Sequence, residues 1–356
     1  MSDQSRPNLF HYATSELSQD AFICWLAAWA DPKYKDADTV LHEIARSFIA
    51  SMIQKVKSDY DVSTLKAVKV RRQAGKLDVL IEINKPEADK DLPGELAILV
   101  EDKTHTFDHG TQLDDYYKYV EGMGYAEEKM VPLYFKTGYQ SRFDTLGVFK
   151  TYMRKDFLDV LTKRSEDIKN AIYHDFLAHL ENMEYVVNQY EKKNIELTEG
   201  PDKWDGNDWR GLFMALYEKF KEDDNANWGY VPNASGGFFG FWWHFQVSPQ
   251  KDYWSYLQWE DNKLCFKIGF SDDFVQATDW KSRASQIKSD WWDILRTEKL
   301  PLLSLSKGKR IGKTMTVAKI DDALHKKEDG TLYLDQMTTR MGEAQDLLKW
   351  VRQKMD

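Results

Sequence analysis

The chain has 356 residues, of which 42% are hydrophobic, and a formal net charge of −9 at pH 7. That length and composition suit one large domain or two ordinary ones with buried cores. The acidic balance argues against a surface that coats nucleic acid broadly, and Cys24 and Cys265 are too few for a disulfide framework or a zinc site. No apolar run approaches the roughly 18 residues of a membrane span, and no secretory leader is evident, so we expect a cytoplasmic protein without a membrane partner.

The first half alternates helical and strand patterns. Apolar residues at Phe22, Trp25, Leu26 and Trp29 have the spacing of one helix face. In chain order, the patterns then predict a helix over 40–56, strands over 68–70, 77–83 and 96–100, a helix that opens with a capping box at 111–114, a strand over 131–135, and helices over 154–162 and 171–190. This order is typical of the α/β class, with a mixed central sheet flanked by helices.

The composition changes over residues 192–202, where charged residues precede a tryptophan-rich second half. Ten of the 13 tryptophans lie between Trp204 and Trp292. Strands are predicted over 238–247, 253–260 and 263–270, with a tight turn at 261–262, and helices over 209–221, 280–295 and 340–354. We therefore predict a first domain of residues 1–195 and a second, α+β domain of residues 196–356.

The second domain contains an aromatic run at residues 238–245. Its rings could form a stacking platform for unpaired bases, since stacking tolerates any sequence. Strand alternation places half of these residues on each face, however, and a hydrophobic core accounts for one face. The domain is a candidate for recognising a DNA target, a modified base, a partner protein or a small signal, and we keep these alternatives open.

Two predicted strands of the first domain carry carboxylates. Asp78 lies at the start of the run 77–83, and Glu101 and Lys103 directly follow the run 96–100. The two-residue period of a strand puts Glu101 and Lys103 on one face and turns the side chain of Asp102 to the other. Charged groups directly after a buried strand are costly unless a partner compensates them, and Mg²⁺, a hard cation that takes oxygen ligands, would do so.

Such a site suits the cleavage of a phosphodiester. Asp78 and Glu101 can share a Mg²⁺ ion that binds a phosphate oxygen and lowers the pKa of a coordinated water. Lys103 can orient or help deprotonate that water and offset the charge that develops on phosphorus. We expect the backbone carbonyl of Asp102, rather than its carboxylate, to lie near the metal, and we expect Mn²⁺ to substitute for Mg²⁺.

These residues resemble the signature of the PD-(D/E)XK nuclease superfamily, with Asp78 on one strand and Glu101-x-Lys103 on the next. Gln112-x-x-x-Tyr116 is similar to the additional motif of the recombination-exonuclease-like branch of that superfamily. The resemblance spans about residues 16–116 and does not cover the second half. It implies a restriction-endonuclease-like fold for the first domain.

The resemblance also implies a metal ligand from the first helix. A helical glutamate often contributes to the metal site in this superfamily, and Glu16 is the matching position. Asp20, one turn later, matches less well. Leu77 stands where the family motif has proline, but the side chain at that place has no chemical role.

Further candidates surround this motif. Gln112 and Tyr116 share one helix face and could contact the scissile strand or brace Lys103, although Tyr116 fits a core stripe equally well. Arg71, Arg72 and Lys76 are candidates for binding the nucleic-acid backbone, as is the basic cluster at 307–313; the alternative is a solvated face. His105 and His109 are expected in an exposed polar loop.

The sequence therefore predicts a Mg²⁺-dependent deoxyribonuclease, an endonuclease rather than an exonuclease, whose second domain selects the target. The family resemblance implies a role in restriction or in defence against foreign DNA. A nuclease that cuts both strands often works as a homodimer, so a homodimer is expected as a possible partner arrangement. Two alternatives are a non-catalytic nucleic-acid-binding or sensing protein on the same scaffold and an RNA-cleaving toxin. The joint presence of Asp78, Glu101 and Lys103 argues against the first of these.

Overall fold

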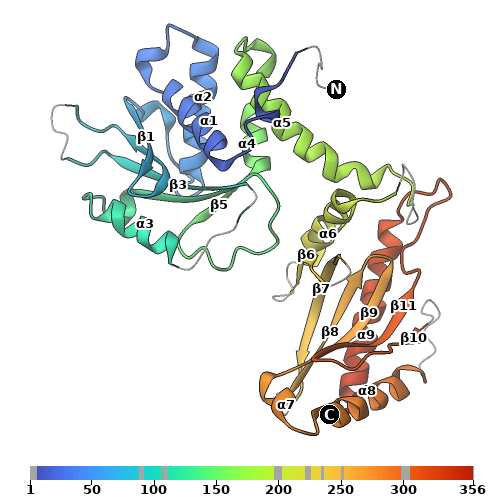
Figure 1. The fold of residues 1–356 in the computed structure, drawn as a ribbon. Helices are drawn as coiled ribbons and strands as arrows, with labels where there is room; N and C mark the ends of the chain where they lie inside the picture. Colours follow the sequence, from blue (N-terminus) through green and yellow to red (C-terminus); the bar gives the residue numbers. More distant parts are fainter. Residues whose placement is uncertain are drawn as a thin grey trace. The chain divides into compact units, whose positions relative to one another are not determined.

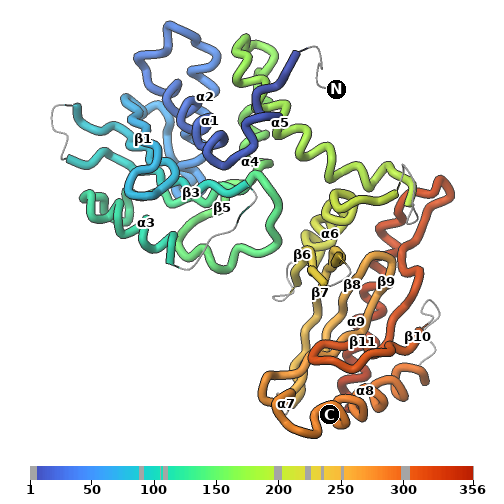
Figure 2. Tube along the Cα trace, in the orientation of Figure 1, coloured from blue at the N-terminus to red at the C-terminus, as the bar shows by residue number. Residues whose placement is uncertain are grey.

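A computed structural model describes residues 6–87, 92–104, 106, 111–195, 203–220, 226–233, 236–249, 252–297 and 305–355 (Figure 1). The chain forms two compact units, Met1–Glu184 and Tyr185–Asp356, and each unit is one continuous stretch of chain (Figure 2). This division falls earlier than the predicted boundary at 195, because residues just after Glu184 already pack in the second unit. The backbone of Gly211 lies against the carbonyl oxygen of Val187, and the rings of Tyr190 and Trp204 are 6.2 Å apart.

The first unit is built on a five-stranded sheet. Its strands are β1 (Val68–Ala74), β2 (Leu77–Ile83), β3 (Leu96–Lys103), β4 (Met130–Lys136) and β5 (Lys150–Met153), in the order β1-β2-β3-β4-β5. β1, β2 and β3 pair antiparallel, whereas β3, β4 and β5 pair parallel, so the sheet is mixed, as predicted. Its helices are α1 (Glu16–Trp29), α2 (Thr39–Gln54), α3 (Gln112–Glu121), α4 (Arg154–Leu161) and α5 (Ala171–Asn188).

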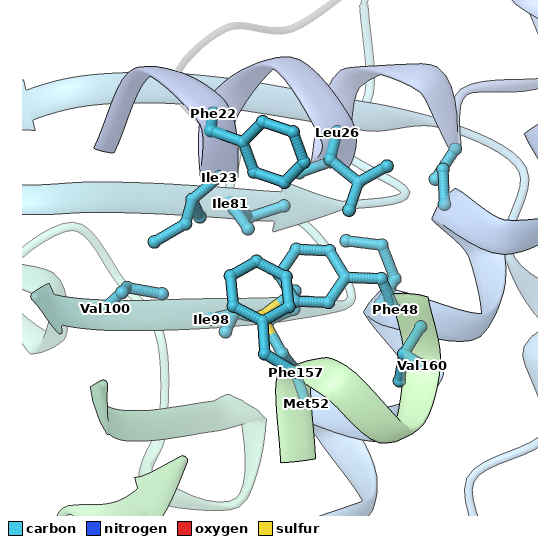
Figure 3. Close-up of a cluster of buried hydrophobic side chains, with 14 of the residues drawn as sticks. Phe22, Ile23, Leu26, Phe48, Met52, Ile81, Ile98, Val100, Phe157 and Val160 are labelled. Atoms are coloured by element: carbon cyan, nitrogen blue, oxygen red, sulfur yellow. The ribbon is translucent and has the colours of Figure 1, made fainter. Parts of the chain in front are cut away.

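The sheet of the first unit separates two hydrophobic cores. On one face, Ile98 and Val100 pack against α1, α2, α4 and α5, where Phe22, Phe48 and Phe157 contribute aromatic rings (Figure 3). The other face packs against α3 through a smaller cluster, whose members include Leu80, Leu99, Leu113, Tyr116 and Tyr134. β2 and β3 are buried on both faces, which confirms the prediction from their continuous apolar runs.

Most element ends in the first half lie within a few residues of their predicted positions. β3 continues past the predicted end at 100 through Lys103, and β5 was not predicted because its four residues have no apolar period. The predicted capping box at 111–114 is wrong. Thr111 makes no side-chain bond to the helix backbone, and its hydroxyl instead lies 3.3 Å from Oδ2 of Asp115.

The second unit is built on a six-stranded antiparallel sheet. Its strands are β6 (Asn227–Val231), β7 (Phe238–Val247), β8 (Tyr253–Glu260), β9 (Lys263–Phe270), β10 (Leu305–Lys307) and β11 (Thr314–Asp321), in the order β10-β11-β9-β8-β7-β6. Its helices are α6 (Gly206–Phe220), α7 (Asp272–Gln276), α8 (Trp280–Leu295) and α9 (Leu334–Met355). Short 3₁₀ helices along the whole chain lie at Leu9–His11, Pro32–Tyr34, Val62–Thr64, Glu127–Lys129, Ser165–Asp167 and Gln189–Glu191.

β7, β8 and β9 have the predicted bounds, and the turn between β8 and β9 lies at Asp261 as predicted. β6, β10 and α7 were not predicted because they are short. β11 was not predicted either, and a register shift between Thr316 and Ala318 interrupts its two-residue alternation. Burial raises the pKa of the Cys24 and Cys265 thiols to about 12, so both stay protonated at neutral pH.

In the part of the chain that the structure describes, no helix has the length and apolarity to cross a bilayer.

Candidate active site

The register of β2 and β3 brings the two predicted carboxylates together. Val79 is paired with Val100, so Asp78 lies opposite Glu101 on the neighbouring strand. Both side chains lie on the face that packs against α3, because they alternate with residues of the opposite core. Glu101 has no exposed surface and Lys103 is 8% exposed, whereas Asp78 is half-buried and reaches solvent.

Glu101 and Lys103 form an ion pair within this site. Oε1 of Glu101 lies 2.6 Å from Nζ of Lys103. Burial, and then the neighbouring Asp78 carboxylate, raise the pKa of Glu101 to about 8, against the opposing effect of Lys103. Burial lowers the pKa of Lys103, but its contact with Glu101 outweighs burial and leaves that pKa above its usual value. Lys103 therefore carries a positive charge at neutral pH.

The carboxylate of Glu101 lies against a second carboxylate. Its side-chain partners among the described residues are Lys103, whose Nζ is 2.6 Å from Oε1, and Asp78. Two neighbouring carboxylates disfavour each other's charged form, and a hard divalent cation held between Glu101 and Asp78 would remove that cost. These two residues therefore fit a divalent cation.

The protein side chains alone do not complete a metal cage. Among the described residues, no three His, Cys, Asp or Glu side chains are grouped so that they could hold a metal ion. A magnesium ion commonly takes only one or two carboxylates and fills its remaining positions with water and phosphate oxygens. Asp78 and Glu101 supply that number of carboxylates.

Asp102 supports the site from the other side of the sheet. Its side chain points away from Glu101, as predicted, and accepts a hydrogen bond from Nε2 of Gln19 in α1. Thr137 donates to Oε1 of the same Gln19 at 2.7 Å, so this amide ties β3 to the end of β4. The backbone N–H of Asp102 donates to Oδ2 of Asp78 at 2.9 Å and fixes that carboxylate. The contact observed at the backbone of Asp102 is thus its N–H, whereas the prediction concerned its carbonyl.

Asp20 is a member of this cluster that sequence reasoning ranked below Glu16. It is 1% exposed, and its Oδ1 has no hydrogen-bond partner among the described residues. Burial and the nearby Asp78 carboxylate raise the pKa of Asp20 to about 7, while Asp102 and Arg72 act in the opposite direction. The signal in the sequence was its position, one turn after Glu16 on the face of α1 that packs on the sheet.

Glu16 holds the chain that follows β3. Its Oε1 accepts hydrogen bonds from the backbone N–H of Thr104 at 2.9 Å and from the hydroxyl of Thr106 at 2.7 Å. Burial opposes ionisation of Glu16, but the hydrogen bonds from Thr106 and Thr104 outweigh burial and lower its pKa. The carboxylate is charged at neutral pH, and the bonds seen here hold the loop.

Gln112 and Tyr116 of α3 lie at the site. Nε2 of Gln112 donates to the hydroxyl of Tyr116 at 2.6 Å. Burial raises the pKa of the Tyr116 hydroxyl, and the hydrogen bond from Gln112 lowers it. The charges of Glu101, Asp78 and Lys103 also act on this pKa, so the hydroxyl lies next to the site. The ring of Tyr116 also belongs to the core of α3. The two alternatives considered for Tyr116 are therefore compatible, since the ring packs and the hydroxyl faces the charges.

Lys136 was missed by the sequence reasoning. It ends β4, is fully buried, and lies beside Lys103 in the parallel pairing of β3 with β4. Its Nζ donates to the carbonyl oxygen of Thr106 at 2.6 Å, so it fixes the same loop that Glu16 holds. A lysine directly after a buried apolar run was the available signal, since Lys103 has the same context.

The predicted basic residues are not gathered at the carboxylates. Arg71 pairs with the buried Glu82 at 3.2 Å, four residues along β2 from Asp78, and so points to the far end of the strand. Arg72 faces α1, where its charge acts on Asp20. Lys76 is exposed in the β1–β2 turn with a φ of 76°.

The remaining predicted basic and histidine positions lie elsewhere. In the cluster at 307–313, Nζ of Lys307 is 5.9 Å from the ring centre of Trp292, and Lys313 pairs with Asp272 at 2.5 Å. Both belong to the second unit. His105 and His109 lie outside the residues that the structure describes.

Comparison of the chain with protein-family models, with curated proteins and with solved structures found no match.

Proposed function

We propose that the first unit is a Mg²⁺-dependent nuclease domain of restriction-endonuclease-like fold, which hydrolyses phosphodiester bonds of DNA. The observation that carries this proposal is the cross-strand pair of Asp78 and Glu101, in which the Glu101 carboxylate is fully buried and in contact with Lys103. The order of elements and the motif at Asp78, Glu101 and Lys103 support the same family resemblance. We propose that Mn²⁺ substitutes for Mg²⁺, since both prefer oxygen ligands.

Each residue of the site has a separate role in the proposed reaction. A divalent cation bound by Asp78 and Glu101 would supply a Lewis acid and an acidified water. Lys103 keeps a positive charge beside the position of the phosphate, where it holds the attacking water and balances the charge that develops on phosphorus. Gln112 and Tyr116 present an amide and a hydroxyl from α3, and these groups position the scissile strand.

We further propose an endonuclease, with a role in restriction or defence against foreign DNA. A nuclease that cuts both strands of a duplex often works as a homodimer, which supplies one site for each strand. The main alternative is a non-catalytic binding protein on the same scaffold. The observation that favours the alternative is the lack of a three-residue metal cluster among the described residues, together with an ion pair that satisfies Lys103 without metal.

Parallel digestion tests the proposal and identifies the substrate. Plasmid DNA, single-stranded DNA, linear duplex and RNA are incubated with the full chain and Mg²⁺, and duplicate reactions contain EDTA. We expect Mg²⁺-dependent nicking or cutting of DNA, including closed circles, which an exonuclease cannot enter. Cleavage confined to RNA would indicate the toxin alternative. No cleavage of any substrate with Mg²⁺ or Mn²⁺ would leave the binding scaffold as the better account.

A further inference from the structure

The hairpin that joins β10 to β11 in the second unit carries a run of positive charge. Residues 305–320 contain five lysines and arginines and no aspartate or glutamate. Two of the five, Lys313 and Lys319, form ion pairs with aspartates. The remaining three are exposed, and they are Lys307, Lys309 and Arg310. The hairpin therefore presents three cations to solvent.

These three exposed cations have no acid partner. Within the part of the chain that the structure describes, no carboxylate lies at ion-pair distance from any of them. The acids on the adjoining half of α8 have other partners. Asp293 pairs with Arg296 at 2.8 Å, and Asp290 accepts a hydrogen bond from the amide of Gln286 at 2.7 Å. Even when Asp290 is counted against the hairpin, cations outnumber acids there.

A buried lysine lies beneath the hairpin. Lys288 of α8 is 4% exposed, and its Nζ donates a hydrogen bond to the carbonyl oxygen of Arg310 at 2.8 Å. An ammonium group has three N–H donors, so two remain for another partner. Burial and the nearby charge of Lys307 both lower the pKa of Lys288. No carboxylate among the described residues pairs with this ammonium, and a bound anion would offset the cost of burying it.

Lys307 faces the same side of α8 as this buried lysine. Its Nζ lies 5.9 Å from the ring centre of Trp292, which is four residues from Lys288 and so on the same helix face. α8 and β10 are neighbours in the second unit (Figure 1). The charge of Lys307 acts on Lys288, so two ammonium groups are held close enough to repel each other. An anion between them would turn that repulsion into attraction.

The backbone of the hairpin is fixed at both ends of its loop. The N–H of Gly308 donates to the carbonyl oxygen of Val317 at 2.8 Å, and a side chain at position 308 would collide with the carbonyl oxygen of Thr316. The N–H of Phe270 donates to the carbonyl oxygen of Lys313 at 2.9 Å. Because the loop is already ordered, an anion can bind its cations without the cost of ordering the backbone.

Repeated phosphate groups are the anions that suit this arrangement best. Several cations along one hairpin match a polymer that carries a charge on every unit. Stable binding to a membrane usually takes an apolar insertion in addition to basic residues. Among the described residues of α8 and of 305–313, no large hydrophobic side chain is exposed. A nucleic-acid backbone also fits the phosphodiester chemistry proposed for the first unit.

We propose that the β10–β11 hairpin binds the phosphate backbone of nucleic acid through Lys307, Lys309 and Arg310, together with Lys288 beneath them. This inference deepens the proposed function and rests on it for the choice of ligand, because it makes the second unit a holder of the nuclease substrate. Contacts to phosphates carry no sequence information, so binding is independent of sequence. The binding itself does not require that the first unit cuts.

The test measures binding of two fluorescent DNA duplexes of unrelated sequence to the full chain by anisotropy. The salt concentration is varied, and EDTA is present so that nothing is cleaved. Each phosphate contact adds about 0.9 to the slope of log Kd against log salt concentration. The variants are Lys309→Gln/Arg310→Gln and Lys288→Met. The matched control is Lys326→Gln/Lys327→Gln, which removes the same charge from exposed residues beyond the other end of β11.

We expect Lys309→Gln/Arg310→Gln to lower the salt slope by about two and Lys288→Met to lower it by about one, as the loss of one phosphate contact per cation predicts. At low salt the double variant should bind about tenfold more weakly or worse, by the same factor for both duplexes. The control should bind like the parent at every salt concentration. Thermal unfolding confirms that each variant is folded at the assay temperature.

Equal slopes for the hairpin variant and the control would overturn the proposal for the hairpin. A folded Lys288→Met protein with the slope of the parent would overturn the role of Lys288. Competition with polyglutamate tests the chemistry of the ligand, and displacement of the duplex by an equal concentration of charge would mean a surface for any polyanion, against the proposal. Vesicles that contain phosphatidylserine test the membrane, and a hairpin variant that loses only vesicle binding would also overturn the proposal.

Failure of this site and failure of the nuclease assignment give different results. A protein that binds as expected but cuts no substrate retains the hairpin site and loses the nuclease assignment. A protein whose hairpin variant binds and cuts DNA like the parent retains the nuclease and loses the hairpin site.

Discussion

Glu101 is the residue of the site whose charge is most strongly disfavoured by its surroundings. Its carboxylate is fully buried beside Asp78, burial and Asp78 raise its pKa to about 8, and Lys103 acts in the opposite direction. In the unfolded chain the same group ionises near pH 4.5. The neutral form therefore stabilises the metal-free protein fully below pH 4.5, and this contribution is lost as the pH rises through about 8.

The first prediction concerns the competition between this proton and the metal. Mg²⁺ needs the charged carboxylate, so its apparent affinity should rise steadily between pH 6 and 8 and level off above. Calorimetric titration of the full chain with Mg²⁺ or Mn²⁺, in buffers of different ionisation enthalpy, measures the affinity and the protons released. An affinity that does not change over this pH range would contradict the assignment of Glu101 as a ligand.

The second prediction concerns Asp20. Burial and Asp78 raise its pKa from 3.8 to about 7, so the contribution of the neutral form is full below pH 3.8 and is lost as the pH rises to about 7. Asp20→Asn removes the charge at constant shape and should increase the free energy of unfolding by about 1–2 kcal/mol at pH 8. At pH 5 only part of that contribution is lost, so the gain should be clearly smaller than at pH 8. Urea denaturation in EDTA at both pH values checks this, and equal effects at the two pH values would refute it.

At the scale of elements, α1 and α3 hold the site from opposite faces of the sheet. The strands that carry the carboxylates could be predicted because buried apolar runs are distinctive, and β2 has the predicted bounds. The sequence offers Asp20 as a candidate, but its contact with the site depends on the rotation of α1 on the sheet, which is set by the packing of Phe22 and its neighbours. The place of Lys136 beside Lys103 follows from the β3–β4 register, which is a long-range property.

The third prediction tests the attachment of α1. Gln19→Leu removes the hydrogen bonds to Asp102 and Thr137 and leaves buried oxygens unpaired. The free energy of unfolding should fall by about 1–3 kcal/mol. Gln54→Leu, at the exposed end of α2, is the control and should change it little. If thermal unfolding shows equal stability for the two variants, the amide does not tie α1 to the strands.

The fourth prediction tests the role of α3. Tyr116→Phe keeps the packed ring and removes the hydroxyl that faces the site, so kcat on DNA should fall about tenfold while the melting temperature stays near that of the parent. Tyr117→Phe, one residue along the same helix, should leave the rate unchanged. A loss of stability without a change in rate would mean that Tyr116 serves only the core.

At the scale of the whole molecule, the two units differ in how much of their structure and function the sequence predicts. In the first unit, an ordered set of residues from Glu16 to Tyr116 predicts a chemistry, and that chemistry stays a prediction. In the second unit, the sequence predicts three central strands and leaves several roles in target recognition open. The spacing of Phe238 and Trp242 predicts their common face, whereas the pairing of Gly240 with Gly229 depends on another strand. Cross-strand pairing of this kind has no local signal.

The most direct test of the central claim is the rate of plasmid cleavage by matched variants of the full chain. We predict that Asp78→Asn and Lys103→Met each lower the Mg²⁺-dependent rate by about 100-fold or more. Asp159→Asn and Lys155→Met, exposed substitutions of the same kind on α4, should cut like the parent. If the folded Asp78 and Lys103 variants cut as fast as these controls, the pair of strands β2 and β3 does not hold the catalytic site.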